Sequence, residues 1–294
     1  MTHFDDIKDD EIRIISRQEV HRKPFYRRWW FWTAVVAAVL LFALSLLLAY
    51  RSSVRHSGHG TVEEVMPESE PVATHPYIVE CEPANVFVND TSVNDVPLRI
   101  YTPVNALPEL QLGTPNPSDN SIILALQAAD IRADNQEIVG AFVLRGELLS
   151  RGSAKKGYCA IVNGTIQIGM AESTPIFEET IAEEGDFFRQ YPLVSEGKMV
   201  ENNPKNKAIR HSLCELDGKV VVVSSLDKES FHDFAQALAD LGVRNAIYLT
   251  GAAAYGFCRD MDEASGESIL TEWNHPFNGR EYRNVNYIVW RVPN

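Results

Sequence analysis

An uncharged stretch of 22 residues, Trp29–Tyr50, constrains the chain most, because only Thr33 and Ser45 interrupt its apolar character. As an α-helix it would be about 33 Å long, which is enough to cross the hydrocarbon core of a bilayer. Aromatic rings stand at both of its ends, where the headgroup region favours them. A 28-residue leader and the lack of a small-residue cleavage site before Arg51 argue against a cleaved signal peptide. We therefore predict an uncleaved transmembrane helix over residues 29–50, with the lipid bilayer as its partner.

The charges beside this helix predict its orientation. Cations are more numerous before the helix than after it, where Arg51 and Arg55 follow; those before it are Arg13, Arg17, Arg22, Lys23, Arg27 and Arg28. Because an excess of cations stays on the cytoplasmic side, we expect residues 1–28 in the cytoplasm. Residues 51–76, rich in Ser, Gly, Pro and Glu, predict a flexible linker. Residues 77–294 are then an exported domain of a single-pass membrane protein, in the periplasm or outside the cell.

Composition narrows the class of this domain. Residues 51–294 hold 20 basic and 34 acidic side chains, and this acidic balance argues against a nucleic-acid partner. The whole chain is 45% hydrophobic, which is too much for a disordered protein. Its four cysteines are too few for a disulfide scaffold, and their pairing cannot be read from spacing.

Short strands joined by tight turns dominate the predicted domain. Residues 121–129 form an almost unbroken apolar run, typical of a strand buried on both faces, and residues 138–144 and 158–162 are similar. The dipeptides Asn163-Gly164 and Asp217-Gly218 each separate two apolar segments. Both therefore predict two-residue β-hairpins.

Two helices are predicted among these strands. One begins at Ser173 or Thr174 and ends before Gly185. The other is capped by Ser230 and ends at Gly242.

The second helix completes a strand–helix–strand unit over residues 219–249. Such a crossover joins parallel strands. The predicted fold class is therefore α+β, with a mixed sheet of short strands, few helices and one β-α-β unit.

No common catalytic motif is complete, because HExxH, GxSxG, GxGxxG and CxxC are all missing from the sequence. Residues 153–156 fit the SxxK of serine acyl-enzymes, but they lie between two predicted strands, and no Lys-Thr-Gly follows. Cys159 and Cys214 lie within apolar strand patterns and are predicted to be buried thiols. The spacing indicates no cofactor and no metal site. A divalent cation held by scattered oxygen atoms would leave no such signature, so that alternative stays open.

Two basic islands, residues 145–156 and 198–210, interrupt the acidic domain, and each contains one acidic residue, Glu147 and Glu201. Solvated surface charge explains many such runs, and Asn and Pro also favour turns. Positive clefts on an acidic protein, however, concentrate small anions, and arginine binds phosphate oxygens with paired N–H groups. We therefore predict an anion-binding cleft. The residues expected to contact the anion are Arg189, Arg210 and Lys205, with Gln190, Tyr191 and Asn202 beside them.

Several segments resemble the phosphodiester glycosidase family over roughly residues 120–294. In the C-terminal half they are Arg210, the hairpin at Asp217-Gly218 with the Val-Val-Val-Ser strand after it, and residues 241–251. Two further segments lie upstream, Asn163-Gly164 and Tyr191–Lys198. Members of that family cleave the glycosidic bond of a sugar-1-phosphodiester, which releases the sugar and leaves a phosphomonoester. The resemblance implies a hydrolase of envelope or host glycans. It places Arg210 at a catalytic position and Thr250 and Gly251 at a substrate-binding position.

Thr250 departs from the family, which has an Asp at this position. Glycoside cleavage uses carboxylates, and a threonine cannot replace one. One hypothesis is a hydrolase in which Glu147 or Glu201 supplies the carboxylate, since neighbouring cations favour its ionised form. The alternative is a non-catalytic envelope protein that binds a glycan or phosphoglycan. The predicted catalytic set is therefore Glu147, Glu201 and Arg210.

Overall fold

The computed structural model describes residues 73–80, 82–152, 154–251, 254–261, 268–274 and 283–293. All of them belong to one compact unit, Glu68–Asn294. The predicted segments 1–28 and 29–50 lie outside the described residues. None of the helices that are described is long and apolar enough to cross a membrane.

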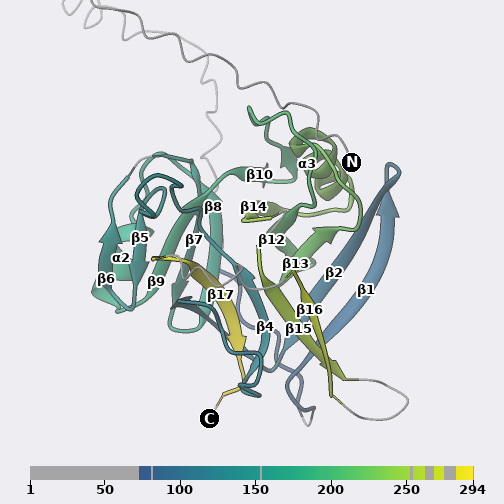
Figure 1. Cartoon of the computed structure of the whole chain (residues 1–294), viewed down its shortest axis with the longest axis horizontal. Coiled ribbons are helices and arrows are strands. Elements are labelled where there is room, and N and C mark those ends of the chain that lie inside the picture. Colours follow the sequence, from purple (N-terminus) through teal and green to yellow (C-terminus); the bar gives the residue numbers. More distant parts are fainter. Residues whose placement is uncertain are drawn as a thin grey trace, which may run out of the picture. The chain divides into compact units, whose positions relative to one another are not determined.

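The described residues form three β-sheets and two α-helices, α2 (Ile176–Ala182) and α3 (Phe231–Asp240) (Figure 1). The seven-stranded sheet runs, in spatial order, β1 (Asn85–Val93), β2 (Val96–Val104), β13 (Lys219–Ser225), β12 (His211–Leu216), β14 (Asn245–Leu249), β10 (Pro192–Ser195) and β11 (Lys198–Met199). A five-stranded sheet runs β16 (Ser268–Trp273), β15 (Gly256–Met261), β4 (Ile122–Gln127), β17 (Asn286–Arg291) and β3 (Leu107–Leu112). A second five-stranded sheet runs β6 (Glu147–Ser150), β5 (Phe142–Leu144), β9 (Asp186–Gln190), β7 (Gly157–Val162) and β8 (Thr165–Met170).

The strand-rich α+β class is confirmed, but the expected mixed sheet is wrong. Every strand pairing within the described residues is antiparallel. The unit β13–α3–β14 exists, and its two strands run parallel to each other. They are not neighbours, however, because β12 lies between them and pairs with both.

Tight turns with two residues of positive φ join most of the hairpins. The predicted turns are confirmed, with φ of 50° and 74° at Asn163-Gly164 and 50° and 71° at Asp217-Gly218. Arg145-Gly146 and Glu196-Gly197 form similar turns, which the sequence analysis did not identify. These values are typical of type I′ turns, whose twist matches that of the flanking strands.

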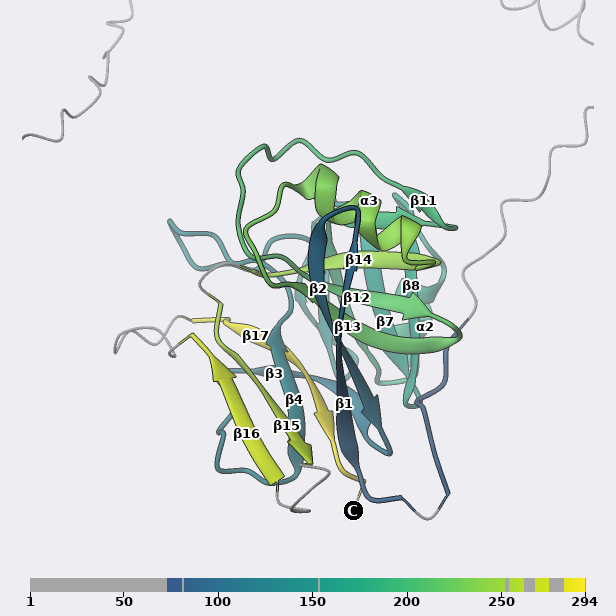
Figure 2. The same ribbon diagram turned by 90° about the vertical axis from the view of Figure 1, so that its right-hand side faces the viewer.

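One hydrophobic core joins a face of each sheet. Alternate residues of β13 divide between two layers: Val220 and Val222 face this common core, whereas Val221 and Val223 face α3. Figure 2 shows α3 beside β14 and the β15–β16 hairpin beside β4. The thiols of Cys159, Cys214 and Cys258 are buried and unpaired, as expected for the first two.

Both predicted helices are confirmed. Ser230 caps α3: its Oγ accepts the Asp233 amide at 3.0 Å and donates to the Asp233 carboxylate at 2.8 Å. Gly242 follows α3 at φ of 96°. The shorter helix α2 packs Ile176, Phe177 and Ile181 on the outer face of its sheet.

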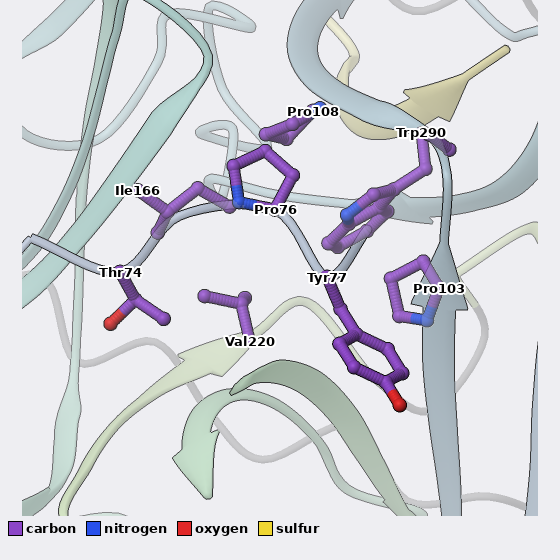
Figure 3. A pocket seen from close by; sticks show the side chains of 9 residues that line it. Thr74, Pro76, Tyr77, Pro103, Pro108, Ile166, Val220 and Trp290 are labelled. Carbon is purple, nitrogen blue, oxygen red and sulfur yellow. The ribbon is translucent and has the colours of Figure 1, made fainter. Parts of the chain in front are cut away.

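The first described segment, residues 73–80, is fastened across all three sheets. Thr74 forms a β-bridge with Ile166 in β8, and the Lys219 ammonium lies 3.8 Å from the centre of the Tyr77 ring. Figure 3 shows Pro76 and Tyr77 beside Trp290. Pro76, Tyr77 and Trp290 line a space of about 10 Å³. That volume suits one water molecule, so it is a packing defect and not a ligand site.

Candidate functional site

Five chain segments meet where the three sheets come together. Strands β4, β9 and β14 end at this place, and strands β7 and β12 begin there, because Gly157 pairs with Gln190 and His211 pairs with Leu249. The amide of Thr250 joins β14 to β4 by donating to the Gln127 carbonyl at 3.2 Å. We call the side chains gathered at these strand ends the polar cluster: Asp130, Lys155, Gln190, Tyr191, Arg210, Tyr248 and Thr250.

A buried ion pair lies at the centre of the polar cluster. The Lys155 ammonium contacts the Asp130 Oδ2 and donates to the Gln190 Oε1 at 2.8 Å. The same ammonium lies 4.6 Å from the centre of the Tyr191 ring. The side chain of Lys155 is 5% exposed, whereas that of Asp130 is 31% exposed. The carboxylate is therefore the member of the pair that solvent or a ligand can reach.

Thr250 holds the other oxygen of this carboxylate. Its Oγ1 donates to the Asp130 Oδ1 at 2.8 Å. Thr250, the position at which the sequence resemblance predicts a substrate contact, thus touches a carboxylate from a different strand end. Both oxygens of Asp130 are oriented by neighbours, which fixes the group without burying it completely.

Burial changes the titration of the cluster. Burial lowers the pKa of Lys155, and the nearby Asp130 carboxylate opposes that effect. Burial raises the pKa of the Tyr248 hydroxyl, and the neighbouring Arg210 opposes it. The titration of Lys155 and of Tyr248 is thus set by burial and by charged neighbours.

Arg210 is buried, and its guanidinium is oriented by backbone and by aromatic rings. Its Nε donates to the Glu229 carbonyl at 3.0 Å, and its Nη2 donates to the Asn206 carbonyl. The guanidinium carbon lies 4.2 Å from the centre of the Phe231 ring and 5.8 Å from that of Tyr248. Such stacking leaves the remaining N–H groups in a fixed orientation.

Gly251 brings backbone close to this group. Its amide donates to the Tyr248 hydroxyl at 3.1 Å. A Cβ at this position would lie 2.7 Å from both the Ile209 carbonyl oxygen and that hydroxyl, so no larger residue fits without movement.

The structure brings some of the sequence-predicted site residues together. Gln190, Tyr191, Arg210 and Thr250 belong to the polar cluster, and Gly251 lies against it. Asn202 uses its amide to hold the Pro192 and Val200 carbonyls at 2.8 and 3.0 Å. Lys205 is exposed in the loop before β12. Arg189 contacts backbone carbonyls, as described below.

The two predicted carboxylates lie on separate elements. Glu147 opens the edge strand β6 and is exposed. Glu201 follows β11 at the edge of another sheet, and its carboxylate lies 2.8 Å from the His232 ring. Among the described contacts of these two residues, none reaches the polar cluster.

Sequence reasoning missed Asp130, Lys155 and Tyr248 as site residues. Asp130 directly follows the buried run 121–129, so its place at a strand end was a usable signal. The SxxK match pointed to Lys156 instead of Lys155, but Lys156 is exposed and pairs with Glu172 at 2.7 Å.

No group of three His, Cys, Asp or Glu side chains suited to a metal ion occurs within the part of the chain that the structure describes. Two open cavities flank residues 171–175. One, of about 440 Å³, includes Arg151, Thr174 and Arg189 in its lining; the other, of about 800 Å³, extends between β8 and the β10–β11 hairpin.

Comparison with known proteins adds a likeness of fold. The catalytic domain of zebrafish N-acetylglucosamine-1-phosphodiester alpha-N-acetylglucosaminidase, auto-inhibited by pro-peptide, superposes with a TM-score of 0.51 at 14% identity, over 76% of this chain and 88% of that one. A hypothetical protein from Synechocystis gives a TM-score of 0.46 at 13% identity, over 72% of this chain and 64% of the other. No protein-family model and no curated protein matches the sequence. The domain therefore shares its fold with a phosphodiester glycosidase, and at this identity the likeness concerns the fold alone.

Proposed function

We propose that the chain is a hydrolase that cleaves the glycosidic bond of sugar-1-phosphodiesters, with Asp130 as its carboxylate. The observation that carries this proposal is the 2.8 Å hydrogen bond from Thr250 to Asp130. It supports a replacement in which the carboxylate missing at position 250 comes from position 130. Glu147 and Glu201, which the sequence favoured, lie on the edges of two different sheets.

The chemistry of the leaving group fits such a site. Hydrolysis breaks the bond between C1 of the sugar and the ester oxygen, and the oxygen of water joins C1. The departing phosphate already spreads negative charge over its oxygens, so it needs nearby cations more than it needs a proton donor. Asp130 would stabilise positive charge developing at C1 and accept the proton released by the water.

Lys155 and Arg210 supply the positive charge of the polar cluster. The Lys155 ammonium neutralises Asp130 in the absence of substrate, and Arg210 is preorganised by two carbonyls and the Phe231 ring. The half-buried Tyr191 ring adds apolar surface against which a sugar can lie. The shared fold with a phosphodiester glycosidase catalytic domain supports the same reaction class.

Turnover tests the proposal. The purified full-length chain is incubated in detergent with a panel of alkyl sugar-1-phosphodiesters, and the released sugar and phosphomonoester are quantified by chromatography. We expect Asp130→Asn to lower kcat by roughly 100-fold or more, because the amide carries no charge. Asp134→Asn is the matched control, since Asp134 lies in the same loop, forms its described ion pair with the exposed Arg132 and accepts the Asn135 amide at 3.0 Å.

The outcome also separates the competing hypotheses. Loss of turnover in Glu147→Gln or Glu201→Gln, with Asp130→Asn active, would contradict the role of Asp130. Saturable binding of the panel without turnover by the wild-type chain would favour the glycan-binding alternative. One observation favours that alternative, namely that an ion pair holds Asp130 to Lys155 in the unliganded site.

We further propose that residues 29–50 anchor this domain on the outer side of a membrane, with residues 51–76 as the linker, whose last residues are held against the domain by the β-bridge from Thr74 to Ile166. The support is the uncharged 22-residue stretch and the excess of cations before it. A site on the outer side would meet phosphodiester-linked glycans of a cell envelope.

A further inference from the structure

Arg189 makes an unusual set of contacts one residue from the polar cluster. It is 5% exposed, and its guanidinium binds backbone carbonyls from two segments. Nη1 donates to Ala171 at 2.7 Å, to Lys155 at 3.2 Å and, more weakly, to Lys156 at 3.4 Å, and Nη2 donates to Glu172 at 3.0 Å. A single planar side chain thus reinforces the junction between residues 155–156 and residues 171–172, where the Ala171 amide also donates to the Lys156 carbonyl at 2.9 Å.

The segment that Arg189 holds is the one that delivers the buried ammonium. Lys155 has a φ of 71°, in the left-handed region that a side chain with a Cβ disfavours. Gly140 packs behind it, where a Cβ would lie 3.0 Å from the Ala154 carbonyl oxygen and 3.1 Å from the Arg189 Cβ. The backbone therefore needs an external constraint to keep Lys155 pointing inward.

We propose that Arg189 is a positioning residue, which clamps the carbonyls around Lys155 so that its ammonium stays against Asp130 and Gln190. The catalytic meaning of this clamp rests on the proposed function, but the clamp itself does not.

This assignment differs from the sequence-based expectation that Arg189 contacts an anion. Arg189 does line the cavity of about 440 Å³ together with Arg151 and Thr174. Its two Nη atoms, however, already donate to four carbonyl oxygens, whose partial negative charge disfavours an anion beside them. Lysine cannot replace it, because one ammonium lacks the planar fork that reaches both segments.

Lysine labelling tests the clamp without reference to any activity. The full-length chain is treated with limiting acetic anhydride at one pH, and the acetylation of each lysine is measured by peptide mass spectrometry. Lys156, whose side chain is 60% exposed, is the internal reference in the same peptide region. In the wild type we expect Lys155 to react at least roughly tenfold more slowly than Lys156, because its ammonium is buried and paired.

In Arg189→Lys we expect the Lys155 rate to approach that of Lys156, with the cooperative thermal transition retained. Arg189→Gln is the second variant, since its amide is close in size and carries no charge. Unchanged protection of Lys155 in a folded variant would overturn the proposal. Loss of the cooperative transition in both variants would overturn it too, because Arg189 would then be a residue of the fold as a whole.

Turnover supplies a second readout if the chain is a hydrolase. A clamp predicts a kcat lowered by roughly tenfold or more with KM changed by less than about threefold. A direct contact with the phosphate predicts instead a raised KM. If the wild type shows no turnover, the proposed function fails, and the labelling result still decides the role of Arg189.

Discussion

A lysine ammonium that is almost wholly buried requires an electrostatic partner and a reason to stay inside. Asp130 and Gln190 are the partners of the Lys155 ammonium, and the proposed hydrolase site depends on these contacts. Removing one member of a buried pair usually costs more free energy than the pair contributes, because the other charge is left without a partner. We therefore expect Asp130→Asn to lower thermal stability as well as turnover. Both must be measured before a loss of turnover is assigned to catalysis.

Gln190→Ala tests how closely Lys155 is held. The Gln190 Oε1 accepts both the Lys155 ammonium at 2.8 Å and the Tyr191 amide at 3.0 Å. The truncation removes the one oxygen that accepts both hydrogen bonds, so we expect the free energy of unfolding to fall by about 2 kcal/mol. Urea denaturation measures this change. Gln236→Ala, on the exposed face of α3, serves as the control, and an equal effect of both variants would refute the prediction.

His211 gives the protein a pH-dependent stability. It is buried against Trp273, its Nδ1 lies 2.6 Å from the Ser224 hydroxyl, and burial lowers its pKa to about 4 from 6.5. The folded state therefore disfavours the protonated ring. This contribution is complete above pH 6.5 and is lost as the pH falls from 6.5 to about 4, by up to roughly 3 kcal/mol.

Urea denaturation at pH 7 and at pH 4.5 measures the effect. His211→Asn should make the difference between the two conditions smaller than in the wild type, whereas the exposed His232→Asn should leave it unchanged. Equal pH dependence in the wild type and in His211→Asn would show that other groups cause it.

The residue scale also shows what the sequence could not predict about the site. The sequence predicted four residues of the polar cluster, because they lie near the basic islands or within segments that resemble a family; they are Gln190, Tyr191, Arg210 and Thr250. Asp130 and Lys155 come from segments 25 positions apart and meet only through the packing of β4 against the other sheets. No periodicity or spacing reports such a contact.

At the scale of elements, local signals predicted best where one residue type dominates the geometry. Asn-Gly and Asp-Gly predicted their hairpins correctly because both residues of each pair tolerate positive φ. Arg145-Gly146 and Glu196-Gly197 form the same turn, but Arg and Glu are not typical of its first position. The strand predicted over residues 138–144 is shorter, because Ile138 turns away to bridge Ile131 and β5 begins at Phe142. The prediction that β13 and β14 are neighbouring parallel strands was wrong, because the Asp217-Gly218 hairpin places β12 between them.

Ser230→Ala tests the best-defined helix signal. The variant removes the Oγ that accepts the Asp233 amide, so we expect the free energy of unfolding to fall by about 1 kcal/mol. The exposed Ser118→Ala provides the control in thermal or urea denaturation. If the two serine variants were equally stable, the cap would contribute nothing to the domain.

At the scale of the whole molecule, the first described segment packs at the end of a hairpin that lies far from the polar cluster. Thr74 bridges Ile166 near the Asn163-Gly164 turn, whereas Lys155 lies beyond the other end of the same hairpin, where Gly157 pairs with Met170. The first described segment therefore lies at the end of β7–β8 remote from the polar cluster.

Asn105 fastens this segment, and its replacement should release it. The Asn105 amide donates to the Val79 and Glu82 carbonyls at 3.0 and 2.8 Å, and its oxygen accepts the Val79 amide at 2.8 Å. Asn105→Gly keeps the φ of 55° and removes these bonds, so we expect a loss of about 2 kcal/mol and faster proteolysis within residues 73–82. Asn163→Gly, at a φ of 50° in the hairpin turn, is the matched control. Equal proteolysis of the two variants would contradict the fastening role.

Fractionation tests the proposed membrane anchor. We expect the full-length chain to resist extraction by alkaline carbonate, and a chain lacking residues 29–50 to appear in the soluble fraction, because the uncharged stretch would supply the bilayer contact. Protease added to intact cells or spheroplasts should cleave the C-terminal domain and spare residues 1–28. Carbonate-soluble full-length protein would be incompatible with a spanning helix.

The bond that is broken tests the central claim most directly. Hydrolysis of a sugar-1-phosphodiester is carried out in water enriched in ¹⁸O, and the products are analysed by mass spectrometry. Attack at C1 with phosphate as the leaving group predicts that the ¹⁸O appears in the released sugar and that Asp130→Asn slows this incorporation by roughly 100-fold or more. Appearance of the ¹⁸O in the phosphomonoester would show attack at phosphorus and would contradict a glycosidase reaction at this site.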